Sequence, residues 1–125
     1  MNQPEYLQYH ADICNEARQL SHRKNNDYSA PQARQHERYP AFANFLQAER
    51  LGICSVEAGI MVRLSDKMSR LTNLIRPGHE RAVHDERIHD TILDGINYLC
   101  ILAAYLDTKM DAVKQDDSPL CQSRL

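Results

Sequence analysis

One stretch decides the fold of this chain: residues 85–107, which read DERIHDTILDGINYLCILAAYLD. Apolar residues recur in it at spacings of three, four and seven, the pattern of one face of an α-helix. The residues on this face are Ile88, Ile92, Leu99, Ala103 and Leu106. From Leu99 to Leu106 the stretch is apolar nearly all round, which predicts that this half of the helix is buried. Asp85 suits the N-cap position of such a helix.

A second helix is predicted over residues 55–75. Ser55 is a good N-cap residue, because its hydroxyl can accept a hydrogen bond from a free backbone N–H in the first turn. Pro77 and Gly78 follow the last apolar residue and are typical of a helix end. The apolar stripe between these signals consists of Val56, Ile60, Leu64, Met68, Leu71 and Ile75.

A third helix is predicted over residues 4–22, with Pro4 at an early helical position. Its apolar stripe consists of Tyr6, Tyr9, Ile13, Ala17 and Leu20. Residues 21–40 are polar and predict an ordered loop or a short broken helix, after which Phe42 begins a short helical piece. No run of alternating apolar and polar residues predicts a strand. The expected fold is therefore an all-α bundle.

Length and charge limit the classes of function. The chain has 125 residues, of which 42% are hydrophobic, a size and composition typical of one domain. Its net charge of −2 argues against a nucleic-acid partner, because phosphate binding requires an excess of basic residues. The longest apolar stretch is far shorter than the about 20 residues that span a bilayer, and no signal peptide is visible. The spacing of the four cysteines fits neither a zinc site nor a dense disulfide framework, so we expect free thiols. We expect a cytoplasmic protein that binds no membrane, with one domain over residues 1–107 and a polar tail over 108–125.

An acidic stripe on the helix over 85–107 bears on function. Glu86, Asp90, Asp94 and Asn97 follow one another at spacings of four, four and three, within an arc of about 80°. Like charges this close repel one another, and a buried carboxylate must be paired or coordinate a metal. Oxygen ligands favour Mg²⁺ or Mn²⁺ over zinc. The stripe is either a metal site or a solvated acidic face in which Asp94 pairs with an arginine.

The helix over 55–75 presents a charged face of its own. Arg63, Asp66, Lys67 and Arg70 share one side of it, so that one carboxylate stands among three cations. Asp66 could join the acids of the stripe as a metal ligand, and the cations could hold phosphate oxygens. Such a combination suits hydrolysis of a phosphoanhydride. The alternative is a structural network in which Arg63, Lys67 and Arg70 pair with Asp66 or with the acids of the helix over 85–107.

Four motifs occur in order along the chain. They are Lys24-Asn25-x-Asp27-Tyr28, Phe42-x-Asn44-Phe45, Arg63-Leu64-Ser65-Asp66-Lys67-x-x-Arg70-Leu71 and Glu86-x-x-x-Asp90-Thr91-x-x-Asp94-x-x-Asn97-Tyr98. In combination they resemble the phage nucleotide-modification-associated domain, a branch of the MazG-like all-α nucleoside triphosphate pyrophosphatases. The resemblance covers roughly residues 10–106.

The resemblance implies a metal-dependent enzyme that cleaves a nucleoside triphosphate between its α- and β-phosphates. The products would be the monophosphate and pyrophosphate, and the cofactor Mg²⁺ or Mn²⁺. The resemblance also implies a homodimer or homotetramer of helical subunits, and a role in remodelling nucleotide pools for DNA synthesis or modification. A purine dNTP such as dGTP is the candidate substrate. Such an enzyme would act in the cytoplasm of a bacterium or of the host of a phage.

Roles for single residues can be stated on this basis. The metal ligands that we expect are Asp66, Glu86, Asp90 and Asp94, and Asp66 and Glu86 are the expected catalytic residues. The expected phosphate contacts are Arg63, Lys67 and Arg70, to which the resemblance adds Lys24. The resemblance further assigns contacts with the base or sugar to Asp27, Tyr28, Phe42, Asn44 and Asn97, with Phe45 as an alternative stacking ring. The general base is either Glu86 or Glu57.

The chain departs from the family pattern at one position. MazG-like proteins usually carry E-x-x-E on the first helix of the site, whereas Arg63 and Asp66 have that spacing here.

Two other interpretations remain open. His84-Asp85 and His89-Asp90 invite comparison with HD-type phosphohydrolases, which are helical and metal-dependent and release phosphate or triphosphate. The last interpretation is a non-catalytic module for nucleotide binding or helical assembly, in which the acids of the stripe are structural.

Overall fold

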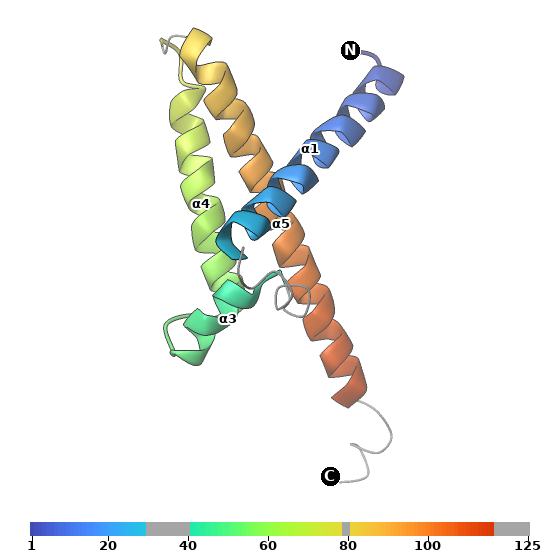
Figure 1. The fold of residues 1–125 in the computed structure, drawn as a ribbon, viewed down its shortest axis with the longest axis vertical. Coiled ribbons are helices and arrows are strands. Elements are labelled where there is room, and N and C mark those ends of the chain that lie inside the picture. The colour runs from blue at the N-terminus through green and yellow to red at the C-terminus, as the bar shows by residue number, and fades with distance from the viewer. Residues whose placement is uncertain (30–40, 79–80, 117–125) are drawn as a thin grey trace.

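The computed structural model describes residues 1–29, 41–78 and 81–116, with side chains over 1–24, 41–78 and 86–114. All regular structure in these residues is helical, which confirms the predicted all-α class. The helices are α1 (Gln3–Ser29), α3 (Ala43–Arg50), α4 (Val56–Leu74) and α5 (Arg81–Asp116). α4 and α5 lie side by side and antiparallel, α1 crosses the middle of α5, and α3 packs beside the start of α4 (Figure 1).

The predicted bounds of α4 are confirmed. The Ser55 hydroxyl accepts a hydrogen bond from the Ala58 N–H at 3.1 Å and so caps the first turn. The helix ends at Leu74, and Gly78 beyond it adopts a positive φ of 100°, a conformation that residues with a Cβ avoid. No described helix combines the length and apolar composition needed to cross a membrane.

The other two long helices extend beyond their predicted ends. α1 continues to Ser29 through residues predicted as a loop. α5 begins at Arg81 and ends at Asp116, so Asp85 is not its N-cap, and the first residues of the predicted tail are helical. Polar residues such as Arg, Lys and Gln extend an existing helix at little cost, although they provide no apolar stripe from which a helix can be predicted.

The main core lies where α3, α4 and α5 meet. Phe42, Val56 and Ile60 are buried at its centre. Partly buried side chains around them are Phe45, Leu46, Ile101, Leu102 and Tyr105. The Phe42 ring meets that of Tyr105 edge-on, with the ring centroids 5.1 Å apart. Gly59 permits close approach of α3 to α4, because a Cβ at this position would lie 3.1 Å from Cδ1 of Phe45.

A smaller contact joins α1 to α5. Ala17 of α1 and Leu93 of α5 are both buried. The Asn97 side-chain amide donates a hydrogen bond of 2.9 Å to the Ala17 carbonyl, which links the two backbones where they cross. The N-terminal half of α1 extends away from this crossing (Figure 1), so Tyr6 and Tyr9 of the predicted stripe are exposed.

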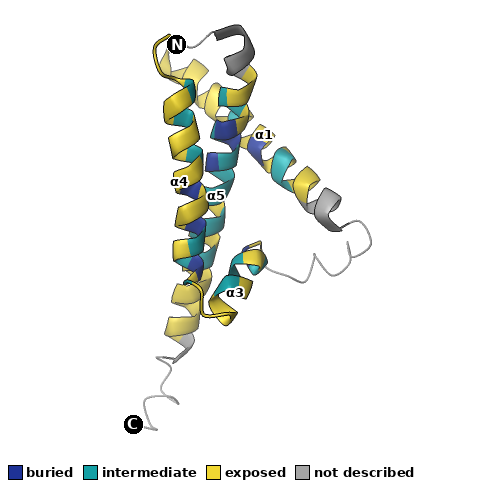
Figure 2. Ribbon diagram, turned by 90° about the vertical axis from the view of Figure 1, so that its left-hand side faces the viewer, coloured by how far each residue is buried: buried dark blue, intermediate teal, exposed yellow. Residues whose placement is uncertain are grey.

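The prediction that the apolar half of α5 is buried is wrong in this structure. Leu99 is 53% exposed and Leu106 is 41% exposed. The reason is visible in Figure 2, where α1 and α3 both lie on one side of the α4–α5 pair. No described helix covers the other side.

Candidate functional site

The charged residues of the sequence motifs converge on Asp94. Its Oδ1 accepts a hydrogen bond from Lys24 Nζ of α1 at 2.8 Å, and its Oδ2 lies 3.0 Å from Lys67 Nζ of α4. We call these three residues the lysine–aspartate cluster. It draws on three helices and joins side chains 70 positions apart in the sequence.

The periodicity of α5 explains why Asp94 meets both neighbouring helices. Asn97, which bonds to α1, lies about 60° from Asp94 around the helix axis. Tyr98, whose ring meets Phe45 of α3 edge-on at 6.5 Å, lies about 40° away in the opposite sense. Asp94 therefore projects between the side of α5 that contacts α1 and the side that contacts α3 and α4.

The cluster keeps the Asp94 carboxylate ionised. The side chain of Asp94 is only 16% exposed, whereas those of Lys24 and Lys67 are 50% and 25% exposed. Burial acts to raise the pKa of Asp94, but the hydrogen bonds and charges of the two lysines outweigh it, and the pKa falls below its ordinary value. Two ammonium groups share one carboxylate, so the cluster carries a net positive charge.

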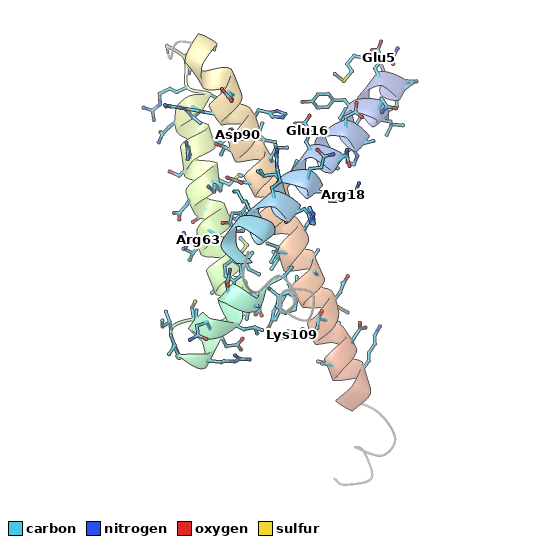
Figure 3. The ribbon with its side chains drawn as sticks, viewed as in Figure 1. Glu5, Glu16, Arg18, Arg63, Asp90 and Lys109 are labelled. Atoms are coloured by element: carbon cyan, nitrogen blue, oxygen red, sulfur yellow. The ribbon has the colours of Figure 1, made fainter. Side chains whose placement is uncertain are left out.

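Further charged residues lie near the cluster on α4 and α5. Asp90 is exposed and precedes Asp94 by one turn, a rise of about 6 Å. Arg63 and Arg70 are exposed on α4, one turn to either side of Lys67. Figure 3 shows Asp90 on α5 above the crossing with α1 and Arg63 on the lower half of α4.

The structure does not gather the expected metal ligands into one group. Within the described residues, no three side chains of His, Cys, Asp or Glu lie close enough together to hold a metal ion. Asp66 and Glu86 are exposed, and Glu86 lies about 12 Å from Asp94 along α5. Only Asp90 and Asp94 remain as neighbours. Both oxygens of Asp94 already pair with ammonium groups, so the expected ligands form no preassembled metal cage in the described residues.

Lys24 reaches the cluster from a helix rather than from the predicted loop, because α1 continues past it. Asp27 and Tyr28 belong to the last turns of α1, but their side chains lie outside the described part of the chain. The expected contact of Lys24 with a phosphate stays a prediction, and the contact that the structure shows is with Asp94.

The remaining nucleoside contacts are dispersed. Phe42 is buried in the core, where its ring packs on Tyr105, and Asn44 is exposed on α3. The side-chain amide of Asn97 already donates to the Ala17 carbonyl. Phe42 and Asn97 are therefore engaged in core packing and in the contact with α1, and Asn97 lies one turn past Asp94.

Glu57, one of the two candidates for the general base, belongs to another cluster. Tyr105 hydrogen-bonds to its carboxylate, and Lys109 Nζ lies 3.5 Å from its Oε2. The bond from Tyr105 and the charge of Lys109 lower the pKa of Glu57, whereas burial and this carboxylate raise the pKa of Tyr105. Glu57 lies about 15 Å from Lys67 along α4, so it cannot serve at Asp94 of the same chain.

Sequence analysis did not anticipate one pair across the α1–α5 crossing. His89 Nε2 lies 2.6 Å from Glu16 Oε2. The sequence contains only a weak signal for this pair. Glu16 precedes Ala17, which is buried at the crossing, so the Glu16 side chain starts close to α5. This pairing occupies the histidine of the His89-Asp90 dipeptide that suggested an HD-type site.

A recess of about 480 Å³ beside α1 is separate from the cluster. It is lined by Arg18, Gln19, His22 and Arg23. These residues lie on the side of α1 turned away from Ala17, so the recess does not include Asp94.

Comparisons with protein-family models, with curated proteins and with solved structures find no match to this chain.

Proposed function

We propose that this chain is a metal-dependent nucleoside triphosphate pyrophosphohydrolase of the MazG-like type that works as a homo-oligomer. The observation that carries the proposal is the lysine–aspartate cluster, in which two ammonium groups from different helices meet at one ionised carboxylate. The expected substrate is a purine dNTP such as dGTP, and the expected cofactor is Mg²⁺ or Mn²⁺.

The charge around the cluster suits a polyphosphate. Lys24 and Lys67 are partly exposed and can turn from Asp94 to phosphate oxygens. Arg63 and Arg70 flank Lys67 and offer planar donors that match phosphate geometry. Because Asp94 is the only anion that these lysines contact in the described residues, an incoming phosphate competes with a single carboxylate.

Asp90 and Asp94 suit an ion that arrives with the substrate, because Mg²⁺ in phosphate sites commonly takes one or two carboxylates together with phosphate oxygens. When bound, Mg²⁺ would neutralise phosphate charge and lower the pKa of a coordinated water. The lysines have a second role in this arrangement. By lowering the pKa of Asp94 they hold its carboxylate in the charged form, ready to accept a ligand or a hydrogen bond.

In the proposed reaction, water attacks the α-phosphorus. The bond from that phosphorus to the bridging oxygen breaks, and pyrophosphate leaves. Lys24 and Lys67 would hold the oxygens of the departing group and stabilise the charge that develops there. Glu86, which is exposed one turn before Asp90 on α5, is the remaining candidate to accept a proton from the water.

The test is pyrophosphate release from each common NTP and dNTP with Mg²⁺ or Mn²⁺. Asp94→Asn should reduce turnover by about 100-fold or more, and Asp111→Asn, an exposed acid elsewhere on α5, should leave it unchanged. Circular dichroism of both variants shows whether the fold is retained. Absence of release from every nucleotide would overturn the proposal, as would equal turnover in Asp94→Asn. Release of phosphate or triphosphate instead would favour the HD-type alternative.

A non-catalytic helical module is a second candidate, favoured by the two lysines that already pair with Asp94. A metal titration separates the two. The pyrophosphohydrolase should show a rise in melting temperature with Mg²⁺ and a nucleotide together, and Asp90→Asn should lose it. The module should show no effect of the metal.

A further inference from the structure

The recess beside α1 is basic and lies away from the lysine–aspartate cluster. Its volume of about 480 Å³ is within the range of small-molecule sites. The described residues that line it include no acid, and they are Arg18, Gln19, His22 and Arg23. We call this site the arginine recess. Lys24, which bonds to Asp94, lies about 120° around α1 from Arg18, so the cluster and the recess use different sides of the helix.

The two arginines approach the recess from opposite sides. Arg18 and Arg23 lie about 140° apart around α1 and about 7.5 Å apart along its axis, and the other two lining residues fall between them. Arginine side chains are long enough to reach across this part of the helix surface. Two guanidinium groups so placed can hold one anionic group between them.

Arg18 is held in place without losing its charge. Its Nη2 donates a hydrogen bond of 2.7 Å to Oδ1 of Asn15, one turn earlier on α1. The amide of Asn15 is neutral, so it orients the guanidinium and leaves the positive charge uncompensated. Within the described residues, neither Arg18 nor Arg23 forms an ion pair with a carboxylate. The remaining guanidinium donors are available to an anion.

The sequence around the arginine recess is also basic. Residues 17–26 contain three Lys or Arg residues and no Asp or Glu. Glu16 lies about 160° around the helix from Arg18 and pairs with His89 of α5, and Figure 3 shows Glu16 and Arg18 on opposite sides of α1. Asp12 lies about 9 Å before Arg18 along the axis. The recess is therefore locally positive, although the whole chain has a net charge of −2.

A smaller recess continues the site along α1. It has a volume of about 340 Å³, and its lining shares Arg18 with the arginine recess and adds Ala11, Cys14 and Asn15. Ala11 and Cys14 provide apolar surface, because a free cysteine behaves as a small hydrophobic residue. A ligand anchored at Arg18 therefore meets positive charge on one side and apolar surface on the other.

We propose that the arginine recess binds a nucleotide, that is, a phosphate ester of a planar heterocycle. The phosphate lies between Arg18 and Arg23, whose planar donors match its oxygens. The ring extends past Arg18 toward Cys14. Guanidinium donors lie at the edge of the group, so the face of Arg18 stays available to stack on the ring. A free phosphate would fill only a small part of the two recesses and would leave their apolar surface uncovered.

This inference does not rest on the proposed activity, and its test measures binding without turnover. Calorimetric titration of the full chain with AMP or GMP in EDTA should show binding. Inorganic phosphate and adenosine should each bind more weakly, because each lacks one half of the ligand. Arg18→Gln and Arg23→Gln should each weaken AMP binding about 10-fold or more. Arg76→Gln is the matched control and should keep the affinity, because Arg76 also bonds to an asparagine three residues before it but lies beyond the end of α4.

A second measurement locates the ring. Cys14 and Cys100 are both exposed thiols, but only Cys14 lines the smaller recess in the described residues. AMP should slow alkylation of Cys14 by iodoacetamide and leave the rate at Cys100 unchanged, as peptide mass spectrometry would show. Equal rates at Cys14 with and without AMP would overturn the proposed position of the ligand.

Lys67→Met distinguishes the arginine recess from the lysine–aspartate cluster, where a nucleotide could also bind. It should retain AMP binding. Loss of binding in Lys67→Met with unchanged affinity in Arg18→Gln would overturn the inference and assign the nucleotide to the cluster. Absence of binding by AMP and GMP would also overturn it, as would inorganic phosphate that binds as tightly as AMP. Tighter binding of a single-stranded oligonucleotide than of AMP would overturn it in favour of a nucleic-acid surface.

Discussion

Replacement of Asp94 by asparagine provides the sharpest test of the lysine–aspartate cluster as a structural unit. The substitution preserves the shape of the side chain but removes the charge that two ammonium groups share. Asp94 is 16% exposed, so its pairs are neither fully solvated nor fully buried. Exposed pairs contribute about 0.2–1 kcal/mol to stability, and loss of one partner of a buried pair costs about 3–5 kcal/mol.

We expect Asp94→Asn to lower the free energy of unfolding by about 2 kcal/mol, between those limits. With an unfolding entropy of about 2.1 cal/mol/K per residue, the melting temperature of this chain should fall by about 8 °C. Lys67 is 25% exposed and Lys24 is 50% exposed, so their charges are screened to different degrees. Lys67→Met should therefore cost about 1 kcal/mol, and Lys24→Met about half as much.

The assay is thermal and urea unfolding of the three single variants and of the double variant of Lys67 and Asp94. The double-mutant cycle should give a coupling of about 1 kcal/mol. The pKa of Asp94 is lowered in the folded state, so its contribution is complete above the unfolded pKa of about 3.9 and is lost as pH falls through the lower folded value. The difference between the original protein and Asp94→Asn should vanish in that acidic range. A larger cost for Lys24→Met than for Lys67→Met, or a coupling near zero, would refute the reasoning.

Three further predictions concern other parts of the fold. Ile60 has no exposed surface, and Ile60→Ala should cost about 3–4 kcal/mol in urea unfolding. Asn97→Ala leaves the Ala17 carbonyl without its donor and should cost about 1–2 kcal/mol, with hydrogen exchange rising in α1 before α4. The pKa of Tyr105 is raised, so its contribution is present below the unfolded pKa of about 10 and is lost as pH rises through the folded value. Tyr105→Phe should remove that part of the alkaline loss of stability, measured by unfolding at a series of pH values.

The bounds of α4 could be predicted from sequence because local signals fix them. Ser55 caps the helix through a neighbour three residues away, and Gly78 takes a conformation that few other residues adopt. The extension of α5 past Asp107 was not predicted, because polar residues predominate there even though Met110 and Val113 follow Leu106 at helical spacing. The end of α1 was not predicted either, since residues 22–29 are mostly polar and show no apolar stripe in the sequence.

The candidate site depended on contacts that no local pattern determines. The sequence placed Asp94 and Lys67 on the facing sides of two helices, and an ion pair between those helices was one of the two interpretations of their charges. Lys24 was named from the resemblance alone. It contacts Asp94 because α1 crosses α5 at Ala17 and stays helical over the two turns from Ala17 to Lys24, and this crossing depends on tertiary packing.

Helical periodicity also separates the two neighbours Lys67 and Met68. They are adjacent in sequence but lie about 100° apart around α4, so Lys67 pairs with Asp94 while Met68 lies against Gly95, the next residue of α5. Because α1 supplies Lys24 to the same carboxylate, loss of the Asp94 charge should loosen α1 while the packing of Met68 on Gly95 stays in place. Hydrogen exchange of Asp94→Asn should therefore rise in α1 before it rises in α4 or α5. An equal rise in all three helices would mean that the cluster stabilises the α4–α5 pair as much as it holds α1.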